Sequence, residues 1–461
     1  DPSPVDNDAS SRWLTVACVA MDRGFCQGPL YSWHMDAATL SLVALAIAIV
    51  VSCTIRLHVG FLSIALAWIV GVYVADMSAR EVMGGFPTRL FLTLAGVTLL
   101  FSQAQANGTL ELIAHKAVRL CKGNVGVIPM MFFVLSFILS SIGPGSIAST
   151  ALMAPMGMAV AGQVGIPAFW MAIMIGHGGN AAALSPFAPA GIIVNGVMDD
   201  IGLGGYELAT YLNNAMAHTV VVFTAYLAFG GLRLLRRRHG GALVVPTADG
   251  GGSTAPGEFG RQHWLTVGVI GVLLAAVVLF NVDVGLGAFA CAIVLALLKA
   301  GDESEAVNLM PWRVIMMVCG VTVLISVLDA TGGLALFTRI LAGISTPDTV
   351  TAVMAFTTGF ISIYSSTSGV VLPAFLPTVP DLAQQLGDVN PLAIASSMNI
   401  GAHLVDVSAL STLGALCMAA APKHEDSRKL FNNLMVWGLS MTLVGSAICW
   451  LLFTVLEVGL G

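Results

Sequence analysis

Residues 123–198 form an unbroken run of 76 positions without Asp, Glu, Lys or Arg. A water-soluble domain does not tolerate such a run, because about one surface position in four is normally charged. The whole chain has the same character: 57% of its 461 residues are hydrophobic and only 10% are charged. This composition excludes a soluble enzyme, a disordered protein and a nucleic-acid binder with a basic surface.

Other charge-free runs divide the chain into lengths that suit a lipid bilayer. They are residues 37–55, 57–75, 90–110, 208–232, 262–282, 349–380 and 430–456. Most can supply about 20 residues of helix, the length that crosses a hydrocarbon core of roughly 30 Å. The sequence therefore predicts an all-α polytopic membrane protein.

One sequence unit occurs twice along the chain, and a constant offset relates the positions of the two copies. Residues 86–113 and 310–337 align without a gap, and 11 of the 28 positions are identical. The identical pairs include Pro87 with Pro311, Arg89 with Arg313, Gly96 with Gly320 and Gly108 with Gly332. Matches of Leu, Val or Ala arise easily between unrelated apolar helices, whereas aligned Pro, Arg and Gly do not. We therefore predict two structural repeats.

The repeats divide the chain into four parts. We predict an N-terminal tail at 1–36, a first repeat at 37–238, a Gly-rich linker at 239–260 and a second repeat at 261–461. Cys18 and Cys26 in the tail could form a disulfide if the tail is extracytoplasmic.

Basic residues orient the repeats. With the Arg-flanked linker in the cytoplasm, 14 of the 19 Lys and Arg residues become cytoplasmic, including Arg313, whereas Arg89 falls outside. This count fits five spans and one re-entrant segment in each half. An odd number of spans inverts the second repeat relative to the first, as is common in secondary transporters. Both chain ends are then extracytoplasmic.

Small and polar residues interrupt one apolar segment in each half. In 125–163 the interruption is Ser140–Ser146 (SSIGPGS), and in 348–386 it is Tyr364–Gly369 (YSSTSG). The two helical pieces on either side of Ser140–Ser146 have about 16 residues each, or about 24 Å of helix. That length is too short to cross the membrane comfortably. We predict two re-entrant helical hairpins whose tips meet near the midplane, because irregular backbone survives there only inside protein or beside a cavity.

The span after each hairpin is also predicted to break. Gly176–Asn180 precedes Ser185 in 167–198, and Asn399–Ser408 lies within 391–421. Unwinding would free carbonyls for a cation and present helix N-termini to an anion. Close helix packing through small residues is the alternative. Four breaks paired by the offset favour a binding site.

Hydroxyl, amide, imidazole and backbone groups are the expected anion contacts, because 123–198 and 340–422 contain no Lys or Arg. The expected substrate-binding residues are Ser140, Ser141, Gly143, Gly145, Ser146, His177, Asn180, Ser185, Ser365, Ser366, Thr367, Asn399 and His403. The expected ligands of a co-transported sodium ion are Ser141, Gly143, Gly178, Asn180, Ser366, Thr367, Ser368, Gly401 and Asp406. No other cofactor and no catalytic residue is expected.

Four ionisable residues within the apolar segments are given specific interpretations. Asp406 is the only acidic residue between Asp388 and Glu425, and an ionisable group within a span is costly unless it has a partner. It is expected to hold a cation, or else to line a water-filled vestibule. His177 and His403 could bind a carboxylate, carry a coupling proton, or only pack. His218 is interpreted as a packing residue.

The runs FPTRLFLTLAGVTLLFSQAQANGT, SSIGPGSIAS and GHGGNAAALSPFAPAGIIVNG resemble the dicarboxylate carrier family of the malonate carrier type. The resemblance is strongest over 38–200, and divalent anion:sodium symporters are structural relatives. It implies a homodimer in the plasma (bacterial inner) membrane that carries small dicarboxylates by an elevator-like movement. The relatives' Ser-Asn-Thr tip motifs are absent, and Ser140-Ser141 and Ser365-Ser366-Thr367 stand in their places.

Several functions remain open at this stage. The favoured function is sodium-coupled secondary transport of malonate- or succinate-like anions. The alternatives are a proton-coupled organic anion carrier and the large membrane subunit of a binding-protein-dependent (TRAP-type) transporter. An intramembrane enzyme is disfavoured, because the chain has no His-Glu-x-x-His, Gly-x-Ser-x-Gly or Ser-x-x-Lys motif. Two hairpins that meet from opposite sides disfavour a channel.

Overall fold

The computed structural model describes residues 36–54, 57–118, 124–237, 245–246, 252–253, 258–387, 389–422 and 425–458. The possible Cys18–Cys26 disulfide, the N-terminal tail and most of the predicted linker lie outside these residues.

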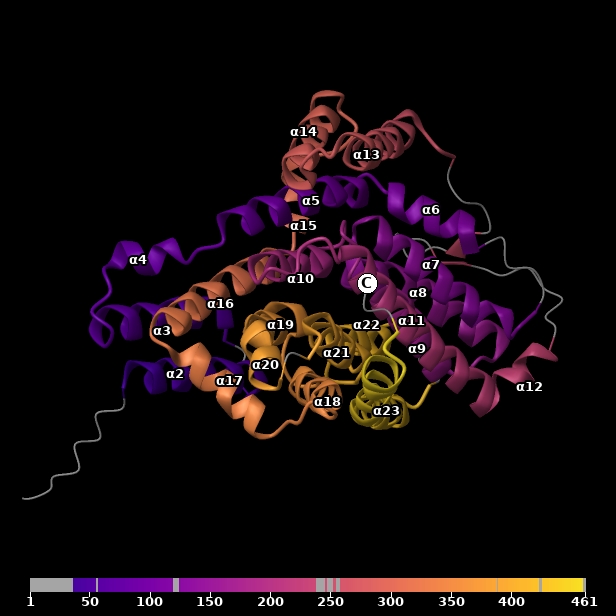
Figure 1. Ribbon diagram of the computed structural model, residues 1–461. Coiled ribbons are helices and arrows are strands. Elements are labelled where there is room, and N and C mark those ends of the chain that lie inside the picture. Colours follow the sequence, from indigo (N-terminus) through magenta and orange to yellow (C-terminus); the bar gives the residue numbers. More distant parts are fainter. Residues whose placement is uncertain are drawn as a thin grey trace, which may run out of the picture. The chain divides into compact units, whose positions relative to one another are not determined.

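Helices make up nearly all of the described chain (Figure 1). Those of the first half are α2 (Ala37–Thr54), α3 (Val59–Tyr73), α4 (Ala79–Gly84), α5 (Thr88–Ala106), α6 (Thr109–Val118), α7 (Val127–Ile142), α8 (Gly145–Val164), α9 (Ala168–Ala181), α10 (Pro189–Asp200), α11 (Glu207–Tyr226), the π-helix η1 (Leu227–Gly231) and α12 (Leu232–Leu235). A two-residue strand, β1 (Val245–Pro246), then pairs antiparallel with β2 (Gly252–Ser253).

The second half has a similar order of elements, with four short helical pieces where the first half has α8. It contains α13 (Arg261–Phe280), α14 (Val284–Leu297), α15 (Glu303–Leu309), α16 (Trp312–Ala330), α17 (Gly333–Gly343), α18 (Val350–Ser362), the π-helix η2 (Thr367–Val371), α19 (Leu372–Phe375), the 3₁₀ helix η3 (Leu376–Thr378), α20 (Val379–Gln385), α21 (Pro391–Leu404), α22 (Thr412–Ala419), α23 (Ser427–Cys449) and the π-helix η4 (Trp450–Val455). Helices α13, α16 and α17 begin at the positions that the constant offset pairs with the first residues of α2, α5 and α6.

Packing follows the same correspondence. Helix α7 packs on α9 and α9 on α11, just as α18 packs on α21 and α21 on α23. The two halves also exchange contacts, because α3 packs on α16 while α14 packs on α5. Inversion of one half relative to the membrane remains a prediction.

Short polar side chains start several helices. Ser78 accepts a hydrogen bond from the Glu81 N–H at the start of α4, while Glu81 accepts one from the Ser78 N–H. Asp283 begins α14 in the same way by accepting from the Leu286 N–H. Such caps satisfy backbone donors that have no partner within the helix.

Among the described residues, five helical stretches are long and apolar enough to cross a membrane. They are Ala37–Thr54, Ala79–Ala106, Gly145–Val164, Trp312–Ala330 and Ser427–Val455. A sixth candidate is the pair formed by α18 and the helices from Thr367 to Gln385, which is bent by 118°. The remaining apolar helices are shorter, so the number of spans in each half remains a prediction.

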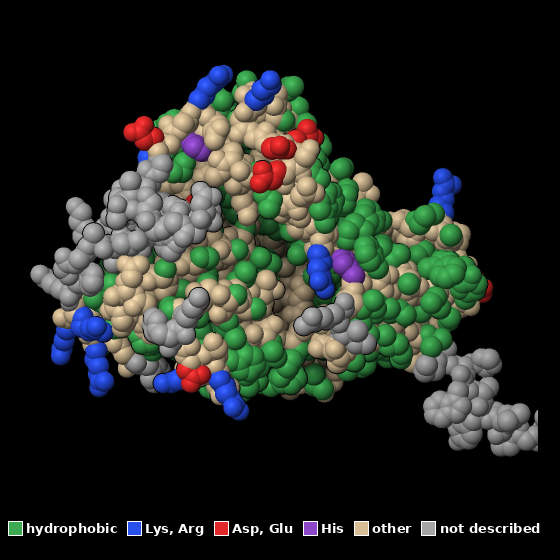
Figure 2. All heavy atoms as spheres, turned by 180° about the vertical axis from the view of Figure 1, so that it is seen from behind, with side chains coloured by type: hydrophobic (Ala, Val, Ile, Leu, Met, Phe, Trp, Pro, Cys, Tyr) green, Lys and Arg blue, Asp and Glu red, His purple; other side chains and the backbone are tan. Residues whose placement is uncertain are grey.

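The outer surface suits lipid. Leu297 and Phe280 expose 77% and 76% of their surface, and many other large apolar side chains are also exposed. Figure 2 shows apolar side chains across the middle of one face and charged ones mostly above and below, with basic and histidine side chains beside a central hollow. In the interior, one buried cluster centres on α7–α9 and a second joins α2, α16 and α18–α21.

Paired glycines let helices of the two halves touch through their backbones. A Cβ added to Gly320 on α16 would collide with the Gly60 carbonyl on α3, and one added to Gly96 on α5 would collide with the Gly285 carbonyl on α14. Gly320 is the counterpart of Gly96 in the aligned repeats, so equivalent glycines make equivalent crossings. Small residues at such crossings are typical of helix packing in membranes.

We expect Gly320→Ala to lower the free energy of unfolding by about 2 kcal/mol, because the backbone it meets cannot rotate aside as a side chain can. Gly268→Ala is the matched control, because no atom lies within 4 Å of a Cβ at that position on α13. Thermal unfolding of the purified variants measures the difference. Equal melting temperatures would show that the crossing has room for a methyl group.

Candidate functional site

The first hairpin tip lies between α7 and α8. Its turn runs through Gly143 (φ 150°) and Gly145 (φ 78°). Residues other than glycine rarely adopt these backbone conformations. The Ser185 hydroxyl donates to the Ser141 carbonyl at 2.7 Å, and the Ser141 and Tyr211 hydroxyls lie 2.8 Å apart. The tip is thus joined to the break between α9 and α10.

The second tip connects α18 to η2. The hydroxyls of Ser365 and Ser52 on α2 lie 2.9 Å apart, and the Ser366 hydroxyl accepts from the Gly369 N–H. The Thr367 hydroxyl donates to the Asp406 carboxyl at 2.6 Å. Asp406 itself lies in the break between α21 and α22, so this tip is also joined to a broken helix pair.

Side chains of both halves support the break that contains Asp406. The Asn180 amide, at the end of α9, donates to the His403 carbonyl at 2.7 Å and also lies close to the Asp406 carboxyl. The Ser411 hydroxyl donates to the Asp406 carbonyl and accepts from the Gly414 N–H at the start of α22. Carbonyls that the break leaves without helical partners therefore receive side-chain donors.

Both spans that follow the hairpins are broken, as the sequence predicts, but the helices do not unwind at the glycines. Helix α9 continues through Gly176–Asn180 and ends at Ala181, and α21 continues through Gly401 to Leu404. Gly178 packs against the backbone of Phe133 and Gly401 against that of Ala355. These glycines permit close packing. The breaks follow them at residues 182–188, which include Ser185, and at residues 405–411, which overlap the predicted Asn399–Ser408.

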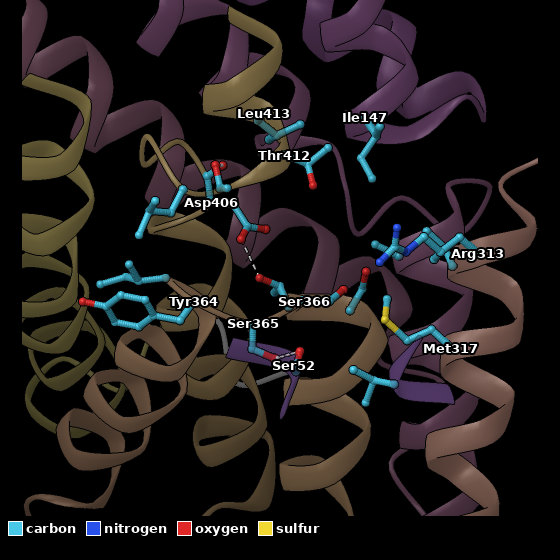
Figure 3. Close-up of a pocket in the computed structure, with 18 of the residues that line it drawn as sticks. Ser52, Ile147, Arg313, Met317, Tyr364, Ser365, Ser366, Asp406, Thr412 and Leu413 are labelled. Atoms are coloured by element: carbon cyan, nitrogen blue, oxygen red, sulfur yellow. Dashed lines mark hydrogen bonds between the residues drawn. The ribbon is translucent and has the colours of Figure 1, made fainter. Parts of the chain in front are cut away.

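A cavity of about 470 Å³ opens between the second tip and the helices that face it. It is lined by Ser52, Leu57, His58, Val59, Ser146, Ile147, Ala190, Arg313, Val314, Met317, Ile363, Tyr364, Ser365, Ser366, Thr367, Ser368, His403, Asp406, Leu410, Ser411, Thr412 and Leu413. In Figure 3, Arg313 and Met317 extend from the side of the cavity opposite Tyr364, with Ser365 and Ser366 between them.

The cavity brings together part of the expected binding set. The expected residues that line it are Ser146, Ser365, Ser366, Thr367, Ser368, His403 and Asp406. The expected residues that are not among those lining it are Ser140, Ser141, Gly143, Gly145, His177, Gly178, Asn180, Ser185, Asn399 and Gly401. Of these, Asn180 lies directly behind the cavity, next to the Asp406 carboxyl.

His177 is buried in a hydrogen-bonded group instead. The Trp437 indole N–H donates to Nε2 of His177 at 2.8 Å, and Nδ1 of His177 lies 2.9 Å from Nδ1 of His218. Because an indole N–H can only donate, a neutral His177 carries its proton on Nδ1 and donates it to His218. His218, interpreted from sequence as a packing residue, is therefore the hydrogen-bond partner of His177.

Two basic residues of the cavity were not expected from the sequence. Arg313 belongs to the first turn of α16, outside the stretches that lack Lys and Arg, and His58 directly precedes α3. The cavity therefore includes side chains that can carry a positive charge, from outside the two stretches that lack Lys and Arg, and the expected contacts of an anion at the midplane stay a prediction. The alignment of Arg313 with Arg89 was the available sequence signal, and it indicated the repeat rather than a site.

The cavity thus presents groups for ions of either sign. Asp406, with the hydroxyls of Thr367 and Ser411, suits a cation such as sodium, whereas Arg313, His58 and the serines of the tip suit a carboxylate. Its volume is in the range of small-molecule sites. A small anion together with a co-bound cation matches this combination of side chains.

Comparison with known proteins relates the first part of the chain to one family. Residues 35–183 match the family model described as the N-terminus of the dicarboxylate carrier protein MatC, which confirms the resemblance over these residues. No curated protein matches the chain.

The fold is similar to those of solved transporters. The YdaH transporter of Alcanivorax borkumensis matches with a TM-score of 0.55 and 14% identity, over 92% of this chain and 100% of that one. MtrF of Neisseria gonorrhoeae, described among antimetabolite efflux pumps, matches with a TM-score of 0.58 and 12% identity, over 91% of this chain and 95% of that one. The family match and the shared fold together indicate a membrane transporter rather than an enzyme.

Replacing Thr367 tests the hydrogen bond to Asp406. We expect Thr367→Val to lower the free energy of unfolding by about 1–3 kcal/mol, because it leaves the carboxylate without this donor. Thr367→Ser keeps the hydroxyl and is expected to cost about 1 kcal/mol or less. Thermal unfolding should rank wild type first, serine second and valine third. A valine variant as stable as the serine variant would contradict a role for the hydrogen bond.

Proposed function

We propose that this protein is a secondary transporter of small dicarboxylates, such as malonate or succinate, and that sodium drives it. The observation that carries the proposal is the cavity in which the second tip meets both Asp406 and Arg313. The match of residues 35–183 to a dicarboxylate carrier family supports the substrate class.

The sodium site is proposed at Asp406. Its carboxylate and the Thr367 hydroxyl lie 2.6 Å apart, and the Asn180 amide is beside them. The Oδ1 atom of Asn180 is buried and has no hydrogen-bond partner among the described residues, so an amide oxygen is left over at this place. Sodium favours hard oxygen ligands of these kinds, and a bound cation would lower the cost of a carboxylate within the membrane.

The substrate is proposed to lie between the second tip and Arg313. Hydroxyls of Ser365, Ser366 and Ser368 line that part of the cavity and can donate to carboxylate oxygens. The first tip contributes Ser146 from the other half. Substrate and sodium would then be neighbours, so each would favour binding of the other through charge attraction, which couples the two movements.

Alternating access is proposed to occur by an elevator-like movement of the hairpins with α9 and α21. Asn180 joins α9 to α21, and Thr367 joins the second hairpin to the same group, so these parts can move as one body. Helices α3, α5, α14 and α16, with their glycine crossings, would form the stationary frame. The inverted orientation of the repeats and assembly as a homodimer in the bacterial inner membrane are part of this proposal.

Proton coupling is the second candidate. It is favoured by His403, an imidazole that lines the cavity and is a side chain able to bind and release a proton. Labelled malonate or succinate uptake into proteoliposomes, under an imposed sodium gradient or an imposed proton gradient, separates the two candidates. Uptake indifferent to both gradients would refute coupled transport. Uptake by the purified chain alone would exclude a subunit that needs a TRAP-type binding protein.

We expect Asp406→Asn to raise the sodium concentration for half-maximal uptake at least about tenfold, because it removes the charge while keeping an acceptor for Thr367. Its melting temperature should stay close to that of wild type. Asp329→Asn, at an exposed acid near the end of α16, is the control for the same chemical change. Wild-type sodium dependence in a well-folded Asp406→Asn protein would refute the proposed role of Asp406.

A further inference from the structure

Equivalent residues of the two halves line two different cavities. In the candidate site they are His58, Val59, Arg313, Val314 and Met317, which we call the Arg313 wall. In a second cavity of about 450 Å³ they are Asp283, Val284, Arg89, Leu90 and Thr93, which we call the Arg89 wall. Arg313 is the counterpart of Arg89 in the aligned repeats, and Asp283 lies within one position of the counterpart of His58. Each wall is the N-terminal part of one glycine crossing.

The two arginines have opposite surroundings. Arg89 donates to the Asp199 carboxylate at 2.9 Å, and its cavity is also lined by Asp200, Glu207 and Asp283. Arg313 forms no ion pair within the described part of the chain. Its cavity contains one acid, Asp406, and the residue that precedes α3 is His58, where Asp283 precedes α14 in the other wall. The repeat therefore preserves the arginine but places it in a cavity with four acids in one half and with one acid in the other.

We propose that Arg313 binds the incoming dicarboxylate at one face of the membrane. At the other face, the ion pair with Asp199 keeps the equivalent arginine, Arg89, from binding it. This inference rests on the proposed function. It predicts that the two faces differ in apparent affinity for the dianion, with the tighter face at the Arg313 wall. In the predicted topology that face is cytoplasmic, because Arg313 falls inside and Arg89 outside.

Charge at the mouth of a cavity acts mainly on the encounter with the substrate. An exposed arginine attracts a dianion over roughly one Debye length, about 8 Å at physiological ionic strength, and salt weakens the attraction. An arginine already paired with a carboxylate, among further acids, provides no such attraction. This difference in charge between the two faces cannot change the substrate gradient at which net transport stops, because both faces belong to one transport cycle. It changes the KM measured from each side.

The test measures the KM for labelled succinate from both sides, in right-side-out and inside-out membrane vesicles. We expect Arg313→Gln to raise KM about fivefold to tenfold from one side and to leave the other nearly unchanged. A substrate with a single charge, the monomethyl ester of succinate, should respond less. Asp199→Asn should lower KM from the opposite side, because it releases Arg89 from its partner.

Three comparisons keep the test independent of folding defects. Arg339→Gln applies the same change to an exposed arginine on α17 that lines neither cavity. Arg313→Lys retains the charge and should keep KM within about twofold of wild type. In the unaltered protein, added salt should raise KM more strongly at the Arg313 side than at the other.

The outcomes separate this inference from the proposed function. A wild-type protein that neither binds nor transports any dicarboxylate refutes the proposed function and this inference with it. Wild-type transport with an unchanged KM in folded Arg313→Gln, or with KM raised equally from both sides, refutes the inference alone. A KM equally sensitive to salt from both sides of the wild-type protein also overturns it.

Discussion

Direct contact between helix backbones at two glycine crossings fixes the positions of the residues around the candidate site. Gly60 of α3 meets α16 next to Met316 and Gly320, and Gly285 of α14 meets α5 in the equivalent way. Because no side chain separates the helices, their N-terminal ends converge. His58 and Arg313 thus line one cavity, next to the first crossing, and Asp283 and Arg89 line another, next to the second. The frame is symmetric in backbone and asymmetric in charge.

The second constraint is that broken helices need hydrogen-bond partners where water is scarce. An unsatisfied backbone group in the bilayer interior costs several kcal/mol. Here Ser185 donates to the first tip, and Asn180 of the first half donates to His403 of the second. Within the break itself, Ser411 donates to the carbonyl of Asp406. Because each break is supported by another element, the hairpins and broken helices form a connected group that can hold a site.

Much of this organisation could be predicted from residue patterns. The constant offset between the repeats predicted the equivalence of α5 with α16, and the turns at Gly143 and at residues 363–366 lie where small and polar residues interrupt the apolar runs. Asp406 was identified because a lone acid in an apolar stretch is unusual. The positions of the helix breaks after each hairpin were less accurate. Glycine both loosens a helix and lets it pack closely, and only the neighbouring backbones of Phe133 and Ala355 decide between these effects.

Sequence alone determined the class of molecule, the duplicated plan, the two interrupted hairpins and the family resemblance, because each depends on local composition or on a repeated pattern. Tertiary structure decided which candidates meet. It buried His177 against His218 and Trp437, left Asn180 behind the cavity, and added Arg313 and His58 to it. The two arginines look alike in the aligned repeats. What distinguishes them is Asp199, which is far from Arg89 along the chain and 2.9 Å from it in space, a proximity that only folding produces.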